Sequence, residues 1–589
     1  MIEDAVQSMR SAHPPLQRPA LDAVLQALID ATQGNEAAWA FSVEAGAYEQ
    51  VVRCMDAYSG DADLQGMCCA ALSALGSTNV DGVPGHWASH AEAAVRAGAV
   101  RAAVSALLAD DVRNELVGPA SMLASVAWSG GTALEIVRAG RAAERLARSL
   151  PLALRAAAST GDTFVLDTIM DALAALVHSD DVCAQQAACP GTLAALAQAL
   201  QLHGAGSYRL ACAACTVMHR ITAHASADEC AAAADDCVNA LRAALVSHDR
   251  ASLQDAAWDA MFVLLTRDAR AMERACAAGV AADAVRSLRS LAAKRADAGD
   301  AAENLARAIE HACDALALLT GDHARSRRTA HAKGAVLVLG AALRAHGDAH
   351  PGVVERACYA MTNLLQTRPE NILPDVILRI VADVAAAMRR HAGDEYVQCG
   401  AASALHGLVA VVLLSPAPPA GGAAGAPPPD ASDQARRLAE TVVLEAAAGA
   451  LRAHSASGPG RLRNDALAVL VLACSGEAFG ENGGPPLQPS VAARAQRAGI
   501  GALLAEALPT TNTDLRARAD TLAAALARLP PPPACAGCGT TDALKLLRCS
   551  RCRTARFCGV ECQHASWAVH KTVCVPPAAT TPADEDNRE

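Results

Sequence analysis

The feature that most constrains this chain is a cysteine-rich stretch at residues 535–574. Its seven cysteines and one histidine form four pairs: Cys535/Cys538, Cys549/Cys552, Cys558/Cys562 and His570/Cys574. In a CxxC pair both sulfurs converge from one tight turn, and a four-residue spacing places two donors on one face of a helical turn. Eight thiol and imidazole donors are the set that two tetrahedral Zn²⁺ sites require. The sequence therefore predicts a module built around two zinc ions.

The spacing leaves two ways of sharing these donors between the ions. In a sequential arrangement the first two pairs hold one zinc and the last two pairs hold the other. In an interleaved arrangement the first pair shares a zinc with the third, and the second with the fourth. Either way, four protein ligands leave no open position for substrate, so we expect both ions to be structural. Their removal should unfold so short a module.

The strings CSRCRTARFC and CQHASWAVHKTVC resemble a MYND-type zinc finger. This resemblance implies the interleaved, cross-braced arrangement, with the following two sets: Cys535, Cys538, Cys558 and Cys562; Cys549, Cys552, His570 and Cys574. MYND fingers are protein-interaction modules, and several bind proline-rich peptides of PxLxP type. The residues that match their peptide-contacting positions are Gln563 and Trp567, although simple packing of Trp567 against the zinc knuckles is a competing interpretation. We expect His564 to be a solvated helix residue.

The rest of the chain has the pattern of an all-α protein. Alanine and leucine recur at three- and four-residue spacing from about residue 20 to 529, interrupted by Gly, Asp-Asp or Pro turns. Apolar residues make up 52% of the sequence but aromatic ones only 3%, so small side chains must form a core of closely packed helices. Sustained period-2 alternation, which would indicate strands, is nearly absent.

A short sequence motif recurs within this helical region, and its glycine stands at positions 46, 98, 140, 191, 279, 334 and 499. Several of the gaps lie near one repeat of about 42 residues, and the gap of 88 lies near two. A second apolar helix follows, as in GMCCAALSALG, DAAWDAMFVLL and RACYAMTNLL. The pattern resembles the armadillo repeat, with HEAT-like repeats as a second choice. The resemblance implies an α-solenoid with a long concave surface.

In armadillo proteins that bind extended peptides, an asparagine of the third helix holds the peptide backbone. Only one of the three strings supplies an asparagine there, Asn363, whereas the matching positions in the others are Val263 and Ser73. We therefore expect no asparagine ladder, and we interpret Asn363 as an ordinary helix residue.

Composition sets the predicted boundaries. Residues 1–19 form an N-terminal segment, 20–529 the repeat array, 530–534 a proline spacer, 535–574 the finger and 575–589 an acidic tail. The Pro-, Ala- and Gly-rich stretch 415–433 is a predicted disordered insertion, 480–489 a similar shorter loop, and the tail is also predicted to be disordered.

The remaining features favour an intracellular protein, cytoplasmic or nuclear. Residues 1–20 contain acids and no apolar core, so we expect no signal peptide. No apolar run approaches the roughly 20 residues that cross a bilayer. Fourteen cysteines outside the finger stand in helical contexts, where a reduced thiol serves as a small apolar residue.

No motif of a metalloprotease, P-loop, dinucleotide-binding turn or nucleophile elbow is present, nor a SET-type methyltransferase motif, so we expect no enzyme. The leading hypothesis is a zinc-binding protein-interaction adaptor in which the finger recognises short, proline-rich segments and the solenoid binds a second partner. The alternative is a RING-like ubiquitin ligase component, although RING fingers place their histidine nearer the middle of the ligand order. Nucleic-acid binding is disfavoured because Lys571 is the only cation on the last helix.

Overall fold

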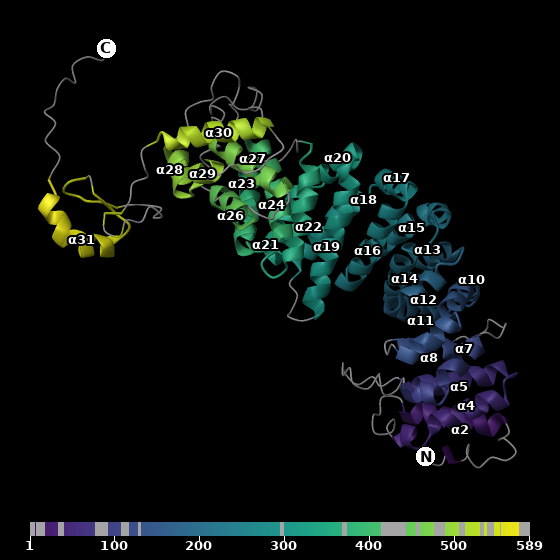
Figure 1. Cartoon of the computed structure of the whole chain (residues 1–589). Coiled ribbons are helices and arrows are strands. Elements are labelled where there is room, and N and C mark those ends of the chain that lie inside the picture. The colour runs from purple at the N-terminus through teal and green to yellow at the C-terminus, as the bar shows by residue number, and fades with distance from the viewer. Residues whose placement is uncertain are drawn as a thin grey trace. The chain divides into compact units, whose positions relative to one another are not determined.

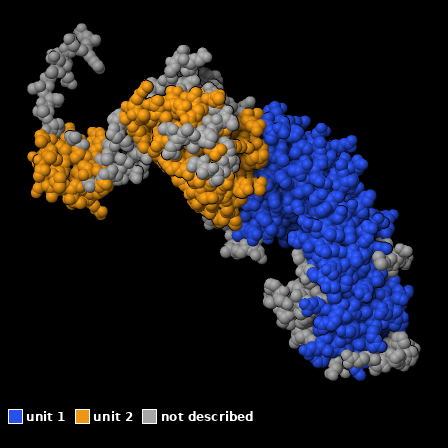
Figure 2. Space-filling view, in the orientation of Figure 1, with its two compact units in different colours: residues 1–346 blue, residues 347–589 orange. Residues whose placement is uncertain are grey.

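A computed structural model of the chain describes residues 6–7, 18–32, 41–76, 92–107, 117–127, 131–294, 300–367, 374–413, 443–454, 460–475, 489–505, 513–529, 535–536, 538, 547–553 and 555–575. These residues divide into two compact units, Met1–His346 and Gly347–Glu589 (Figure 2). Most of the predicted N-terminal segment, the insertion at 415–433, the loop at 480–488, the spacer at 530–534 and the tail beyond residue 575 lie outside the described residues.

The described residues of unit 1 form helices joined by turns and short connections, with no strand among them (Figure 1). Its helices are α2 (Arg18–Thr32), α4 (Ala47–Ala57), α5 (Ala62–Gly76), α7 (Ala99–Leu107), α8 (Val117–Ala127), α9 (Gly131–Ala139), α10 (Ala142–Thr160), α11 (Phe164–Ser179), α12 (Asp181–Ala187), α13 (Thr192–His203), α14 (Tyr208–Thr222), α15 (Ala227–Ser247), α16 (Ala251–Arg267), α17 (Ala269–Ala278), α18 (Val280–Ala293), α19 (Asp300–Gly321), α20 (Ala324–Ala332) and α21 (Ala335–His346).

Unit 2 continues the helical pattern and adds the finger with its two short strands. Its elements are α22 (Pro351–Leu364), α23 (Pro374–Arg390), α24 (Glu395–Leu413), α26 (Val443–His454), α27 (Gly460–Ser475), α28 (Pro489–Arg497), α29 (Ile500–Ala505), α30 (Thr513–Ala527), β1 (Leu547–Arg548), β2 (Arg556–Phe557) and α31 (Val560–Val573). None of the helices that can be described in either unit is long and apolar enough to cross a membrane.

The repeated glycine marks the junction between the first and second helix of a repeat. Six of the seven glycines found from the sequence have a positive φ, between 66° and 86°, a conformation that costs glycine nothing. At the third copy the left-handed residue is instead Arg141, with a φ of 51°. A Cβ on the preceding Gly140 would collide with the Val104 side chain. That glycine is thus required by close packing rather than by its own backbone angle.

The gap of 88 residues between two copies of the motif has a structural reason. Helix α15 occupies the place of a first and a second helix in one piece of 21 residues, and its sequence contains no glycine. Without a residue that readily adopts positive φ, the chain continues as one helix across the junction. The interpretation of this gap as two repeats is therefore confirmed.

Equivalent helices of successive repeats pack against one another in rows. In unit 1 the third helices α5, α8, α11, α14, α16 and α19 form one row, and the second helices α4, α7, α10, α13, α15, α18 and α21 form another. In unit 2 the corresponding rows are α22, α24, α27 and α30, and α23, α26 and α29. Alanine, leucine and valine dominate the buried residues between the rows. Each repeat therefore buries its apolar face only against its neighbours, as a solenoid requires.

The cysteines of the repeats pack as apolar residues, as predicted. Ten of the 14 are buried and the other four are half-buried. Burial raises the pKa of the Cys358 thiol to about 12, so this side chain remains neutral at physiological pH.

Polar contacts join residues that stand one repeat apart. Arg242 Nε lies 2.6 Å from a carboxylate oxygen of Asp283. Nε2 of His248, at the end of α15, donates to the carbonyl oxygen of Gly204 at 2.7 Å, directly after α13 in the preceding repeat. His248 thus satisfies a carbonyl group that follows a helix. Arg242 shares the buried Asp283 carboxylate with Arg286, whose Nη2 lies 2.8 Å from it.

Candidate metal centre

The described residues of the finger bring the eight predicted donors together in two groups. Site 1 consists of Cys535, Cys538, Cys558 and Cys562, and site 2 of Cys549, Cys552, His570 and Cys574. Within each group all the ligand atoms lie within 4.8 Å of one another. The interleaved arrangement is confirmed, and the sequential one is excluded.

A two-stranded hairpin and one helix position these donors. Strands β1 and β2 are antiparallel, with Leu547 opposite Phe557, and the second CxxC pair lies in the connection between them. Helix α31 carries Cys562 in its first turn and His570 in its last, so it supplies a ligand to each site. The backbone N–H of Ala536 donates to the carbonyl oxygen of Arg556 at 2.7 Å, which ties the first CxxC turn to β2.

The distances between donors fit tetrahedral zinc. With Zn–S bonds of about 2.3 Å and Zn–N bonds of about 2.05 Å, a tetrahedron has S···S edges of about 3.75 Å and S···N edges of about 3.55 Å. The Sγ atoms of Cys538 and Cys558 are 3.7 Å apart, as are those of Cys549 and Cys574. Cys552 Sγ lies 3.6 Å from His570 Nε2. Every one of these separations is far longer than the roughly 2.05 Å bond of a disulfide.

The chemistry of the donor set also calls for a cation. Hydrogen bonding to the neighbouring Cys558 raises the pKa of the Cys562 thiol, and burial together with the thiols of site 2 raises the pKa of Cys574. A group of thiols in contact cannot ionise together without a positive charge at its centre. By contrast, the backbone N–H of Cys552 lowers the pKa of Cys549 to about 6. Zn²⁺ binding would supply the missing charge at both sites.

Two aromatic rings flank the histidine of site 2. The Phe557 ring is completely buried and meets the His570 ring edge-on, with centroids 5.5 Å apart. The Trp567 ring lies on His570 at a tilt, with centroids 5.7 Å apart. Phe557 stands directly before the third cysteine pair, and the spacing of the metal donors did not predict its place in the site.

The two predicted peptide-contacting residues lie one turn apart on α31. Gln563 is half-buried, and 40% of the Trp567 residue surface is exposed. Trp567 therefore packs on a zinc ligand and also faces solvent, so the packing interpretation accounts for only part of its surroundings. The neighbouring His564 is exposed, in agreement with its expected place outside both metal sites.

The position at which peptide-binding armadillo proteins have an asparagine holds a different residue in each of the three repeats compared, as the sequence indicates. Asn363 lies half-buried on α22 and Val263 half-buried on α16. Ser73 is buried on α5, and its hydroxyl is 2.8 Å from that of Ser121 on α8. These three positions therefore present no row of amides.

Fold and site together define a helical-repeat protein that carries a cross-braced finger able to bind two zinc ions. Residues 535–574 match the family model described as MYND finger. This match covers the finger alone. No curated protein matches the chain.

Two solved structures share the repeat fold. An engineered protein is 18% identical, with a TM-score of 0.55, over 81% of this chain and 99% of its own. A structure described as a phosphorylation switch that controls the interaction between cadherin and beta-catenin is 15% identical, with a TM-score of 0.50, over 89% of this chain and 100% of its own. At these identities the likeness establishes an armadillo-like helical repeat fold and nothing further.

Proposed function

We propose that this protein is a non-enzymatic intracellular adaptor. The finger recognises short, proline-rich peptide segments through the face of α31 that carries Gln563 and Trp567, and the helical repeats bind a second protein. Joining two modest binding sites in one chain raises the avidity for a partner, or pair of partners, that engages both.

The observation that carries the proposal is the position of Trp567. Its ring is partly exposed, yet it is held against His570, whose own position zinc would fix. An exposed aromatic side chain on a rigid support loses little entropy on binding, and such residues dominate the energy of many interfaces. Gln563, one turn earlier, provides an amide that can bond to the backbone of an extended peptide.

The chain itself contains a segment of the expected pattern. Residues 485–489 read PPLQP, with proline, leucine and proline at the first, third and fifth positions. This segment provides a peptide probe of defined sequence. Binding is measured on a chain that carries Leu487→Ala, so that the chain's own segment does not compete with the added peptide.

The repeat fold supports the second half of the proposal. The solved structure described by the interaction between cadherin and beta-catenin concerns a protein interaction, and this chain shares its helical repeat fold. In unit 2 the third helix α22 leaves Tyr359 44% exposed, which provides an aromatic contact point.

The test is a binding titration of a labelled nine-residue peptide, GGPPLQPSV, with the zinc-loaded Leu487→Ala chain. Adding Trp567→Ala should weaken binding at least about thirtyfold, the effect of losing a hot-spot residue worth about 2 kcal/mol. The control is Val569→Ala, a smaller truncation on the other flank of α31 at a residue that is 75% exposed. It should bind like the parent chain.

Equal affinity of the Trp567→Ala and parent chains, at the same zinc content, would remove the finger's recognition role. Binding that also survives a leucine-to-alanine change in the peptide would show that the contact is unspecific.

A further inference from the structure

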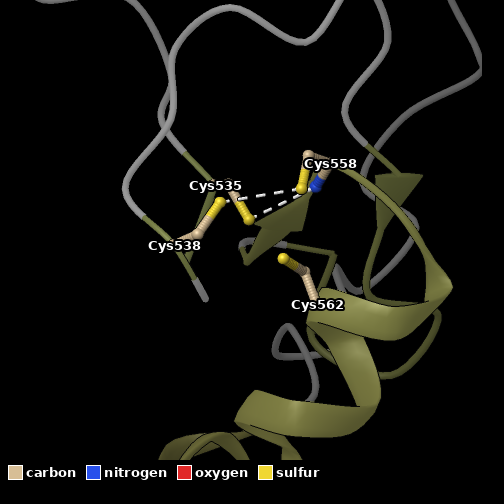
Figure 3. Close-up of side chains that lie close together, drawn as sticks. All are labelled: Cys535, Cys538, Cys558 and Cys562. Carbon is tan, nitrogen blue, oxygen red and sulfur yellow. Dashed lines mark hydrogen bonds between the residues drawn. The ribbon is translucent and has the colours of Figure 1, made fainter.

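The two zinc sites differ in their access to solvent. In site 2 the exposed fractions are 2% for Cys549, 5% for Cys552, 5% for Cys574 and 8% for His570. In site 1 Cys538 is exposed, Cys558 and Cys562 are half-buried, and only Cys535 is buried. Figure 3 shows the four sulfurs of site 1 and the short separation between those of Cys538 and Cys558. A reagent in solution therefore meets the thiolates of site 1 first.

The charge of the two sites adds to this difference. Four thiolates on Zn²⁺ carry a net charge of −2, whereas three thiolates and a neutral imidazole carry −1. The more negative set holds its electrons less tightly and is the better nucleophile. Site 2 is further protected because the Phe557 and Trp567 rings lie against its histidine.

Within site 1 the most accessible thiolate can be identified. Cys535 Sγ is buried and accepts a hydrogen bond from the backbone N–H of Cys558 at 3.3 Å. Such a bond stabilises the thiolate and lowers its reactivity. Cys538 is the one exposed cysteine of all 21, and Cys558 Sγ lies 3.7 Å from it.

We propose that Cys538 is an oxidation site for peroxides and that its oxidation releases the zinc of site 1 alone. The zinc-bound thiolate of Cys538 attacks one oxygen of hydrogen peroxide. The O–O bond breaks, an S–O bond forms, and the other oxygen leaves as hydroxide, which takes up a proton to become water. The thiolate of Cys558 then attacks the oxidised sulfur, so that an S–S bond forms and the S–O bond breaks. The second oxygen also leaves as water.

In total, two thiolates lose two electrons, one peroxide and two protons become two waters, and site 1 keeps only two of its four thiolates as zinc donors. The interleaved pairing decides what remains. Site 2 still joins the hairpin connection to the end of α31, so the oxidised finger keeps one zinc ion. The first CxxC turn alone loses its metal link to α31. Oxidation of site 1 does not require that the finger bind a peptide.

The first experiment follows zinc release from the full zinc-loaded chain with a metallochromic indicator while hydrogen peroxide is added. We expect one zinc per chain to leave at least about tenfold faster than the second, since thiolate reactivity follows exposure. Simultaneous release of both ions at one rate would overturn the proposal.

Trypsin then separates the two sites in the same sample. The cysteines of site 1 lie on the peptides 529–545 and 557–571, whereas those of site 2 lie on 549–551, 552–553 and 572–588. After release of the first zinc, mass spectrometry should find 529–545 linked to 557–571 by a disulfide between Cys538 and Cys558. The three site 2 peptides should carry free thiols. A disulfide that involves a site 2 peptide at this stage would contradict the proposal.

A pair of variants tests the role of Cys538 itself. Cys538→His keeps four ligands at site 1 but removes the exposed thiolate, so the fast release should slow at least about tenfold. Cys562→His gives site 1 the same ligand set and charge but retains Cys538 and Cys558, so its fast release should persist. Zinc analysis before oxidation confirms two ions per chain in both variants. Equal slowing in the two variants would mean that site charge, and not Cys538, controls the reaction. The wild-type cross-link decides the site even if a variant fails to load.

Discussion

The completely buried Phe557 side chain should contribute strongly to the zinc affinity of the finger. It packs among Cys535, Cys549, Cys552 and Cys574, so it stands between the two metal sites. Truncating a buried Phe to Ala costs about 3–5 kcal/mol, and so small a module, which can relax around the cavity, should lie near 3 kcal/mol. Because such fingers fold only with metal, the lost packing energy appears in metal binding.

A loss of about 3 kcal/mol lowers the product of the two zinc-binding constants by roughly 100-fold, since 1.4 kcal/mol corresponds to a factor of ten. If the two ions bind cooperatively, the 100-fold loss in the product corresponds to a tenfold loss in the binding constant of each ion. The free zinc concentration that half-loads Phe557→Ala should then be about tenfold higher than for the wild type. Chelator-buffered zinc titrations of the full chain, with bound metal counted, measure this midpoint directly.

Two further variants make the reasoning refutable. Phe557→Leu retains most of the apolar volume and should shift the midpoint by less than half as much on the logarithmic scale. Val569→Ala removes two methyl groups from a residue that is 75% exposed and should shift nothing. A Phe557→Ala finger that loads at the wild-type zinc concentration would show that the ligands alone, without the buried ring, fix the structure.

Two predictions concern the repeats. A Cβ on Gly118 would collide with the backbone carbonyl oxygen of Gly66, so Gly118→Ala must force α8 away from α5 and lower the stability by about 2 kcal/mol. Around Gly449 on α26 there is open space, so Gly449→Ala should raise the stability by up to about 1 kcal/mol. Hydrogen exchange of the peptides covering these helices should therefore become about thirtyfold faster in Gly118→Ala and slower in Gly449→Ala. If α5 and α8 of Gly118→Ala are protected as well as in the wild type, or better, the packing argument is wrong. Burial disfavours the charged form of His311, but its hydrogen bond with Asp255 and the nearby carboxylates outweigh this, so the pKa of His311 is raised. The protonated ring should thus stabilise unit 1 below about pH 6.5 and lose this effect as the pH rises through the raised pKa. The difference in urea midpoint between wild type and His311→Gln should therefore shrink from pH 6 to pH 8.5. A difference that stays constant over this range would exclude the charge effect.

Much of the finger could be predicted because its chemistry is local. Two donors from one CxxC turn, or from one helical turn, are already half a tetrahedron, whatever the rest of the chain does. The residues and the number of zinc ions therefore followed from spacing alone. Which pairs meet is a non-local question, since it depends on how the hairpin places its connection against the last turn of α31. The family resemblance anticipated this pairing, and the geometry established it.

The repeats divide in the same way. Helical periodicity and the returning glycines predicted an all-α array, because each helix and each turn is encoded by neighbouring residues. The structure alone revealed that α15 runs without a break across a junction and that Arg141, rather than Gly140, takes the left-handed conformation there. The second depends on the neighbouring repeat, because the Val104 side chain leaves no room for a Cβ at position 140.

The same distinction separates chemical identity from accessibility. The sequence contains seven cysteines in the finger, and as residue types all seven are equally able to bind zinc. Only the fold made Cys549 buried and Cys538 exposed, and only the fold placed Trp567 against a ligand while leaving part of it in solvent. Ligand type is a property of each residue, whereas exposure is a property of everything packed around it. For that reason the sequence determined what the finger binds, and the tertiary structure decided which of its atoms can react.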